Sequence, residues 1–265
     1  MQEKSRGILI FAFDTDQINY VKIAEQSARL AKHFLNLPVT LITDQLVDSD
    51  YFDSVICIDN NLENYRTGMM AGSSWRNGER YQAYRLSPYD ETILLDSDYL
   101  VLDTHLLKLL GVVEDYGMPT KNTNLNCISM DGLMGMLSLP YVWATVVLFK
   151  KTPRAQTFFE FVGRIQRNYP YYQQLYQIRE SNYRNDYAFA MANNVLNGYT
   201  TGSDNQIKLL TADQNVKSIE SQSSRLVIRT EDRAVVLPRQ SLHVMDKNYL
   251  LSQQHLKFVD QICQE

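Results

Sequence analysis

The sequence has few cysteines and no long apolar run, and each shortage excludes a class of protein. Its three cysteines, Cys57, Cys127 and Cys263, lie far apart without a CxxC pair, which excludes a disulfide scaffold and a cysteine zinc site. No apolar run reaches the roughly 18–20 residues that a membrane-spanning helix needs. Residues 1–6 lack the apolar stretch of a signal peptide. These absences predict a soluble protein of a reducing compartment, the cytoplasm.

What the chain does contain is typical of a globular protein. Its 265 residues are 45% apolar and 21% charged, which is enough for a buried core and excludes wholesale disorder. A net charge of −4 argues against a protein coated with basic residues for non-specific DNA binding. The average hides one basic stretch, residues 150–187, which holds seven basic residues against three acidic ones, together with six tyrosines.

Short apolar runs and one periodic segment predict the fold class. Residues 7–13, 39–43, 54–58 and 92–95 are apolar runs typical of strands buried on both faces of a parallel sheet. From Ile18 to Leu35, apolar residues recur every three or four positions, which predicts an amphipathic helix that ends before Pro38. Strands that alternate with helices indicate an α/β fold whose ligands bind beyond the carboxyl ends of the strands.

The remaining segments extend this pattern. We expect helices over residues 79–86, 104–110, 153–165, 185–196 and 249–262, a strand over residues 141–150, and a hairpin of residues 225–228 and 234–237. Residues 115–140 have no clear period and predict a long loop, which in a compact domain is usually functional. Because there is no repeat and no obvious linker, residues 1–265 are predicted to form one domain.

Two carboxylates follow the fourth predicted strand, in the segment Asp96-Ser97-Asp98. Residues two apart in an extended backbone point the same way, so both side chains can face one ion. A buried carboxylate without a partner costs several kcal/mol, so a cation is expected beside them. Mg²⁺ and Mn²⁺ take oxygen ligands of this kind and leave positions open for substrate phosphates. The alternative is a polar turn at the end of a strand.

The wider segment from Arg80 to Leu102 adds a spaced pattern. It places an aromatic residue four positions after the basic one, a leucine at six and a tyrosine at nine, then an apolar strand and DxD. This resembles the donor-site segment of GT-A glycosyltransferases, particularly the glycogenin-type, galactinol-synthase-like family. The resemblance implies a GT-A, Rossmann-like sheet that is mixed but mainly parallel. It divides the chain into a nucleotide-sugar half of about residues 7–110, an acceptor half of about 111–248 and a C-terminal helix over 249–265.

The resemblance also implies a site. In this family the end of the first strand and a nearby aromatic residue hold the nucleotide, and basic residues contact the donor phosphates. The nucleotide-sugar residues implied here are Ala12, Phe13, Asp14, Tyr20, Arg80, Asp96, Ser97 and Lys247. For Tyr20 the alternative is a half-buried aromatic on the helix surface.

The implied metal ligands are Asp96, Asp98 and His243. Imidazole suits Mn²⁺ somewhat better than Mg²⁺, so Mn²⁺ is the expected ion and Mg²⁺ the alternative. A lone histidine is more often structural, but the upstream DxD favours a ligand role for His243.

The family places an acidic residue against the reacting sugar, and Asp186 stands in the corresponding segment. Its alternative role is a favourable charge at the start of a helix. Acceptor residues implied nearby are Trp143, Arg184 and Asn185. Trp143 has the alternative of a core position, the more frequent place for a tryptophan in an apolar strand.

Together these residues predict a metal-dependent transfer of a sugar from a nucleoside-diphosphate sugar, UDP-sugar first, to an acceptor hydroxyl. The chain also looks like glycosyltransferases of tailed bacteriophages, so the acceptor could be a hydroxymethylated pyrimidine in DNA, within the host cytoplasm. The basic, tyrosine-rich stretch is compatible with stacking on nucleic acid, or with a solvated helix face over packed tyrosines.

Other acceptors and other classes stay open. A polysaccharide, a lipid-linked sugar or a protein are alternative acceptors. A sugar-nucleotide nucleotidyltransferase also uses DxD, but it usually carries a glycine-rich loop that residues 12–16 lack. A non-catalytic carbohydrate-binding module would not need the two carboxylates.

Overall fold

Residues 4–60, 64–65, 74–135, 139–179, 182–199, 207–213 and 215–265 are described by a computed structural model. Part of the expected loop over residues 115–140 lies outside these ranges. Within the described part of the chain, no helix combines the length and the apolar character needed to cross a membrane.

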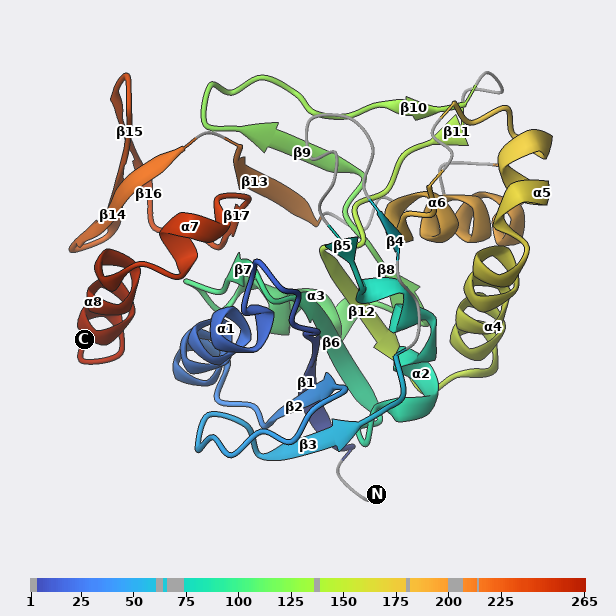
Figure 1. The fold of residues 1–265 in the computed structure, drawn as a ribbon, viewed down its shortest axis with the longest axis horizontal. Helices are drawn as coiled ribbons and strands as arrows, with labels where there is room; N and C mark the ends of the chain where they lie inside the picture. The colour runs from blue at the N-terminus through green and yellow to red at the C-terminus, as the bar shows by residue number, and fades with distance from the viewer. Residues whose placement is uncertain are drawn as a thin grey trace.

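The main sheet has six strands, and they follow the expected order of an α/β protein (Figure 1). Its order is β3 (Ser54–Cys57), β2 (Val39–Thr43), β1 (Arg6–Phe11), β6 (Glu91–Asp96), β12 (Val146–Lys150) and β8 (Tyr116–Gly117). The pairs among β3, β2, β1 and β6 are parallel, whereas β12 is antiparallel to both its neighbours. The predicted fold class, a mixed and mainly parallel sheet flanked by helices, is confirmed.

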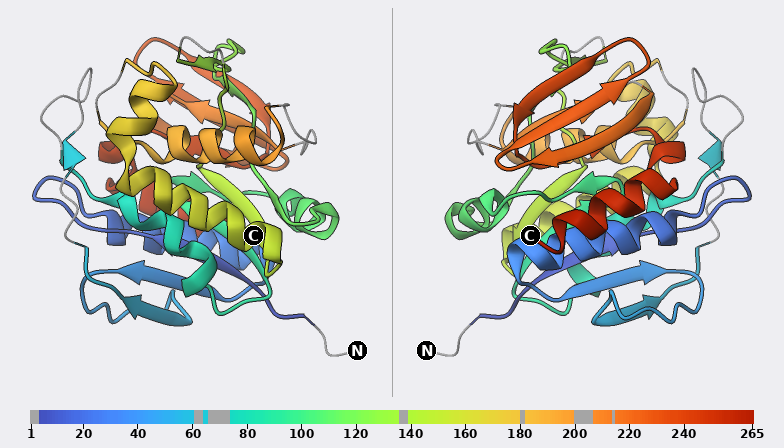
Figure 2. Two further views of the ribbon diagram at one scale, coloured as in Figure 1. Left: turned by 90° about the vertical axis from the view of Figure 1, so that its right-hand side faces the viewer. Right: turned by 90° about the vertical axis from the view of Figure 1, so that its left-hand side faces the viewer.

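Helices cover both faces of this sheet, which explains why its central strands β1, β2 and β6 are largely apolar and buried (Figure 2). Ile8 and Ile10 of β1 pack in a cluster with α1 (Tyr20–Leu35) and α3 (His105–Val112). Leu9 and Phe11 point to the opposite layer, which contains α2 (Ala83–Leu86), α4 (Pro153–Arg167) and α6 (Asn185–Leu196). Each such side chain contributes about 1.5–3 kcal/mol when fully buried, so both layers hold β1 in register.

A second sheet, which the sequence analysis did not predict, joins distant parts of the chain. Its order is β7 (Tyr99–Leu100), β17 (Leu242–Val244), β13 (Lys208–Ala212) and β9 (Lys121–Asn124). β17 runs antiparallel to β7, and β13 runs parallel to both β17 and β9. Strands of two to five residues carry little periodicity, so the sequence predicts a loop where residues 121–124 form β9.

Short elements complete the fold. The segment predicted as one helix over 79–86 is a 3₁₀ helix, η1 (Asn77–Gln82), followed by α2. The others are β4 (Asn64–Tyr65), β5 (Ser74–Trp75), β10 (Leu133–Met134), β11 (Leu139–Pro140) and α5 (Tyr169–Leu175).

One predicted strand is shorter than expected. Only residues 146–150 of the segment 141–150 form β12. The preceding residues bond elsewhere, since the Trp143 amide donates to the Pro119 carbonyl at 2.9 Å and the Ala144 amide donates to the Asp186 carboxylate at 2.8 Å. Those contacts replace a strand ladder, so the prediction for residues 141–145 was wrong.

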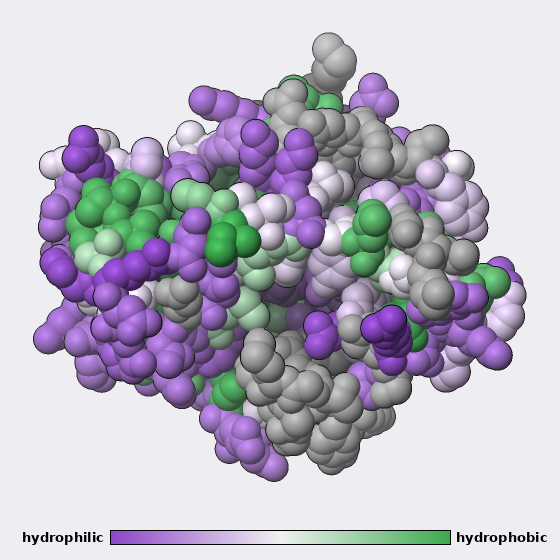
Figure 3. Space-filling view, turned by 90° about the horizontal axis from the view of Figure 1, so that it is seen from above, coloured by the Kyte–Doolittle hydropathy of each residue, from purple (hydrophilic) through white to green (hydrophobic). Residues whose placement is uncertain are grey.

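The C-terminal part forms a separate layer on α1. The predicted hairpin is confirmed as β15 (Arg225–Thr230) and β16 (Ala234–Pro238), with β14 (Val216–Gln222) as a third strand. Apolar side chains gather on the surface at the left of Figure 3. On β16, Val236 is 58% exposed. The predicted helix over 249–262 is instead two helices, α7 (Lys247–Leu250) and α8 (Gln253–Ile262), because Ser252 caps the second one through the His255 amide.

His255 of α8 is buried completely, and neither ring nitrogen has a hydrogen-bond partner among the described residues. Its ring lies against Tyr249 and Phe258, at centroid distances of 5.3 and 6.2 Å. Burial lowers the pKa of His255 to about 4, and the positive charge of Arg29 on α1 adds to the shift. Arg29 itself bonds Asp260 at 2.6 Å.

This depressed pKa predicts acid sensitivity of the C-terminal layer. The unfolded chain takes up a proton near pH 6.5, whereas folded His255 does so only near its pKa of about 4. The contribution of neutral His255 to the free energy of unfolding is therefore fully present above about pH 6.5. It is lost as the pH drops toward 4, by up to about 1.4 kcal/mol per pH unit. Urea unfolding across this range measures the loss.

The control is His255→Leu, which keeps an apolar filler at the position. We expect its unfolding free energy to depend less on pH than that of the wild type between pH 6.5 and 4. Equal slopes for the two proteins would contradict this assignment.

Candidate functional site

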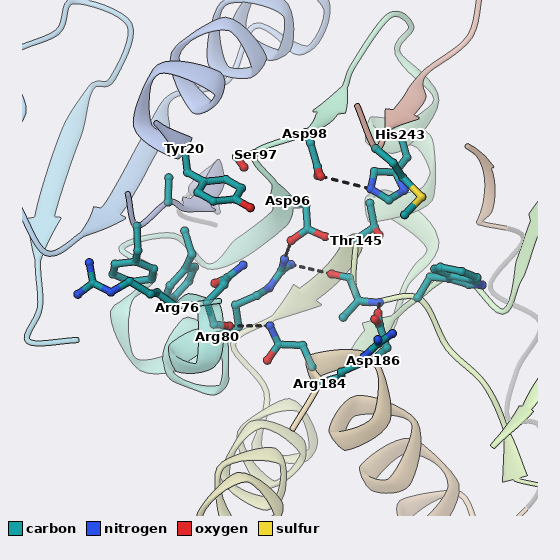
Figure 4. Close-up of a pocket in the computed structure, with 18 of the residues that line it drawn as sticks. Tyr20, Arg76, Arg80, Asp96, Ser97, Asp98, Thr145, Arg184, Asp186 and His243 are labelled. Carbon is teal, nitrogen blue, oxygen red and sulfur yellow. Dashed lines mark hydrogen bonds and ion pairs between the residues drawn. The ribbon is translucent and has the colours of Figure 1, made fainter. Parts of the chain in front are cut away.

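A pocket of about 300 Å³ opens at the carboxyl ends of β1 and β6 (Figure 4). Strand β1 has β2 on one side, where the chain runs next, and β6 on the other. The strand order therefore reverses between β1 and β6. Open α/β sheets bind ligands at this switch point. The pocket therefore lies where the fold class alone would place a ligand.

Asp98 and His243 meet in this pocket although they are far apart in the sequence. Asp98 directly precedes β7, and the antiparallel register of β7 and β17 pairs Tyr99 with His243. The Val244 amide donates to the Asp98 carbonyl at 3.0 Å, which locks the two segments together. As a result, His243 Nε2 lies 3.5 Å from Asp98 Oδ2.

Lys247 reaches the same carboxylate from the start of α7. Its ammonium lies 2.5 Å from Asp98 Oδ2, and the Asp98 side chain is only 13% exposed. Burial alone would raise the pKa of Asp98, but the Lys247 ammonium and the His243 ring hold this pKa well below its usual range. Asp98 Oδ1 is buried and has no hydrogen-bond partner among the described residues. Asp98 is therefore an anion with one oxygen atom unsatisfied.

Asp96 is paired with a different cation. The Arg80 guanidinium binds the Asp96 carboxylate through one amino group and donates to the Ala144 carbonyl at 2.7 Å through the other. Arg80 is 1% exposed, and its burial lowers the pKa to about 10, against the attraction of Asp186 and Asp98. It therefore carries its charge at neutral pH and holds Asp96 at the edge of the pocket.

The three predicted metal ligands, Asp96, Asp98 and His243, all line one pocket, but their side chains do not surround a common point. Within the described residues, no three His, Cys, Asp or Glu side chains are close enough together to hold a metal ion. Two of the three do fit an ion: cis ligands of an octahedral ion stand about 3 Å apart, close to the observed Asp98–His243 distance. The unsatisfied Asp98 Oδ1 and the N/O donor set also fit Mn²⁺ or Mg²⁺.

The nucleotide end of the pocket is formed by the end of β1 and the start of α1. Ala12, Phe13 and Tyr20 all line it, and Figure 4 shows the Tyr20 ring directed toward Ser97. Asp14 lies behind this wall: its carboxylate accepts from the Val21 amide at 2.9 Å and from Gln45 at 2.8 Å. Asp14 thus fixes the start of α1, while its predicted contact with a nucleotide stays a prediction.

Arg76 is a pocket residue that the sequence analysis missed. Its guanidinium bonds Asp44 at 2.6 Å and donates to the carbonyls of Asp14 and Asn60, each at 3.0 Å. These contacts tie the ends of β1, β2 and β3 together. Its one sequence signal is its place four residues before Arg80.

The opposite end of the pocket is formed by α6 and the segment before β12. The Asp186 carboxylate accepts from the Ala144 amide at 2.8 Å. Burial, followed by the negative charge of Asp186, raises the pKa of the Tyr141 hydroxyl well above its usual value, and the two side chains are hydrogen-bonded. Tyr141 also contacts Trp143 edge to face, at 5.1 Å between centroids, and was missed by the sequence analysis.

The three predicted acceptor residues all line the pocket but differ in how accessible they are. Arg184 is exposed and lies over the Tyr187 ring at 5.8 Å, and Trp143 is half-buried. Asn185 is buried and donates to the Asn77 carbonyl at 2.7 Å, which joins α6 to η1. Of the three, Asn185 has the most evident structural role.

The basic, tyrosine-rich stretch has most of its rings inside the protein. Tyr171 is 63% exposed, whereas the other five are buried: Tyr169, Tyr172, Tyr176, Tyr183 and Tyr187. The stretch therefore combines exposed arginines with mostly buried tyrosines, which agrees with the alternative interpretation of this segment.

Comparisons with known proteins concern the fold. No protein-family model and no curated protein sequence matches the chain. Among solved structures, apo GlyE, a glycosyltransferase of Streptococcus pneumoniae TIGR4, is 16% identical, with a TM-score of 0.39 over 77% of this chain and 45% of that one. The chain thus spans less than half the length of GlyE.

The second similar protein is the galactosyltransferase LgtC. Its complex with donor and acceptor sugar analogues is 12% identical, with a TM-score of 0.47 over 97% of this chain and 94% of that one. An active-site mutant of LgtC is 13% identical, with a TM-score of 0.49 over 96% and 94%. All of these TM-scores are below 0.5, so function has to be inferred from the pocket itself. GlyE and LgtC, which this chain resembles in fold, are both glycosyltransferases.

Proposed function

We propose that this protein is a metal-dependent glycosyltransferase that moves a sugar from a nucleoside-diphosphate sugar, UDP-sugar first, to an acceptor hydroxyl. The observation that carries the proposal is the meeting of Asp98 and His243 at the switch point of the sheet, 3.5 Å apart. Core packing does not explain a buried carboxylate, an imidazole, a buried arginine and a partly buried lysine around one cavity.

The proposed donor site uses the charges of this cavity. Asp98 and His243 would hold the ion, with Asp96 as the third ligand. When bound, Mn²⁺ acts as a Lewis acid that stabilises negative charge on the departing nucleoside diphosphate. Lys247 and Arg80 supply charge-assisted hydrogen bonds to phosphate or sugar oxygens, which are stronger than neutral ones. The Tyr20 ring offers a face for the nucleotide base.

Asp186 is the proposed catalytic residue. Its carboxylate is held by the Ala144 amide and the Tyr141 hydroxyl, so its orientation is set before any substrate arrives. In this position it would orient the acceptor hydroxyl, take its proton, or stabilise positive charge that develops on the sugar.

The acceptor is proposed only as a hydroxyl-bearing molecule. The buried tyrosines leave Tyr171 as the exposed ring of the basic stretch, which offers little surface for stacking on bases. A hydroxymethylated pyrimidine in DNA therefore stays a prediction. Retention on duplex DNA at low salt, lost as salt is raised, would support it, and no retention at low salt would remove it.

The central prediction concerns Asp98→Asn. This change keeps the size of the side chain but removes the charge that pairs with Lys247 and faces His243. We expect a folded protein whose donor turnover falls by more than about 100-fold, since even changes outside the first ligand shell cost 10–100-fold in affinity or activity. Hydrolysis of the donor sugar nucleotide with Mn²⁺ measures this loss without knowledge of the acceptor.

A thermal-shift panel of UDP-, GDP-, ADP- and CMP-sugars, with and without Mn²⁺, identifies the donor first. A ligand at 100-fold over its Kd stabilises the wild type by about 2.7 kcal/mol.

The matched control for Asp98→Asn is Asp260→Asn on α8, which changes an exposed carboxylate paired with Arg29. Wild-type turnover in Asp98→Asn, or the same loss in Asp260→Asn, would refute the site.

A second prediction follows from the contact between Lys247 and Asp98. In the metal-free protein the ammonium holds Asp98 Oδ2, the oxygen atom beside His243 Nε2, so Lys247 would compete with an ion bound by these two atoms. We expect Lys247→Met to bind Mn²⁺ about tenfold more tightly without nucleotide, and to bind UDP about tenfold more weakly, each equal to about 1.4 kcal/mol.

Electron paramagnetic resonance of free Mn²⁺ and calorimetry with UDP measure these two affinities. Lys217→Met is the control, because Lys217 of β14 is 59% exposed and pairs with Glu231 in the turn between β15 and β16. Unchanged or weaker Mn²⁺ binding in Lys247→Met would show that the lysine does not compete with the ion.

A further inference from the structure

The Thr211 hydroxyl lies between Asn122 and His243, inside the second sheet. Strand β13 stands between β9 and β17, and its register pairs Thr211 with His243 on one side. Thr211 Oγ1 is 2.8 Å from Asn122 Oδ1 and 3.4 Å from His243 Nδ1. Thr211 is fully buried, and Asn122 is 1% exposed. Water therefore does not compete for these bonds.

The donors and acceptors of Asn122, Thr211 and His243, a row of three side chains, determine the direction of the hydrogen bonds between them. A threonine hydroxyl has one proton, and here it is donated to Asn122 Oδ1. With the Asn122 side-chain amide in this orientation, Thr211 Oγ1 can act toward His243 only as an acceptor, which assigns the proton to Nδ1. In a neutral imidazole this leaves Nε2 with a free lone pair. Nε2 is the atom that faces Asp98 Oδ2, at 3.5 Å, so in the metal-free protein Asp98 favours a proton on Nε2 while Thr211 favours one on Nδ1.

Asn122 is itself fixed at the base of a hairpin. Its backbone amide donates to the Asp131 carboxylate at 2.6 Å, and its backbone carbonyl accepts from the Met130 amide at 2.8 Å. Met130 lines the pocket, so the same hairpin forms part of the pocket wall and supports the histidine.

We propose that Thr211 and Asn122 are positioning residues that hold His243 in the tautomer with a bare Nε2, directed at the cation site. The inference rests on the proposed function, because it supplies the reason why a bare nitrogen is needed there. Groups that bond the second nitrogen of a ligating histidine fix its tautomer and ring orientation. The row accounts for a threonine and an asparagine at buried positions where apolar residues would pack equally well.

The test compares three substitutions of buried threonines. Thr211→Val removes the hydroxyl and keeps the size, whereas Thr211→Ser keeps the hydroxyl. Thr43→Val on β2 is the control, because its buried hydroxyl has no hydrogen-bond partner among the described residues. The readouts are the Mn²⁺ affinity in the absence of sugar nucleotide and the nitrogen-15 NMR shifts of the His243 ring in metal-free protein. The His243 signals are assigned from their absence in His243→Asn, at a mildly alkaline pH.

We expect the wild type, Thr211→Ser and Thr43→Val to show Nδ1 protonated and to bind Mn²⁺ within about threefold of one another. Thr211→Val should show a mixture of tautomers and bind Mn²⁺ 10–100-fold more weakly, the usual cost of losing such a support. A wild-type ring protonated at Nε2, or a Thr211→Val protein with the wild-type tautomer, would overturn the inference. A wild type that binds no Mn²⁺ would overturn the proposed function, while the tautomer of the metal-free protein would still decide the role of Thr211.

Discussion

The pairing of β7 with β17 is the constraint on which the candidate site depends. Asp98 and His243 are separated by most of the chain, and two short strands bring them together through the register of Tyr99 with His243. A one-residue slip would turn the His243 side chain to the other face of the sheet, because side chains alternate along a strand. The neighbouring strand β13 braces β17 on its other side. The second sheet therefore fixes the geometry of the pocket, although it is smaller than the first.

The same pocket shows how buried charges can be kept stable before a substrate binds. Asp98 is paired with Lys247, and Asp96 with Arg80, so each carboxylate has its own cation. An unpaired buried charge would be costly, and its pKa would shift until it became neutral. The low pKa of Asp98 indicates that pairing outweighs burial. An incoming ion and a diphosphate bring opposite charges, so together they can exchange partners with these pairs without leaving any one of them alone.

The parts of the fold that the sequence predicted are those in which periodicity is long or burial is two-sided. Strand β2 and helix α6 have the predicted bounds, and the DxD segment lies at the end of its strand, with Asp96 as the last residue of β6. The failures have a common cause, namely long-range contacts that local patterns do not contain. Trp143 lies outside β12 because its backbone amide donates to the Pro119 carbonyl. The second sheet was not predicted because its strands are short. Arg76 and Tyr141 line the pocket because of tertiary packing, which the local sequence does not predict.

The order of the strands also limits how a donor could lie in the proposed site. Tyr20 and the end of β1 form one wall, the DxD segment lies at the end of β6 in the middle, and Ala144 precedes β12 beside Asp186. A base, a diphosphate and a sugar would therefore lie across these three strands in that order. With its base against Tyr20 and its phosphates at Asp98, the donor would direct its sugar toward Asp186. An acceptor hydroxyl would then approach from the α6 side, where Arg184 is exposed and Trp143 half-buried.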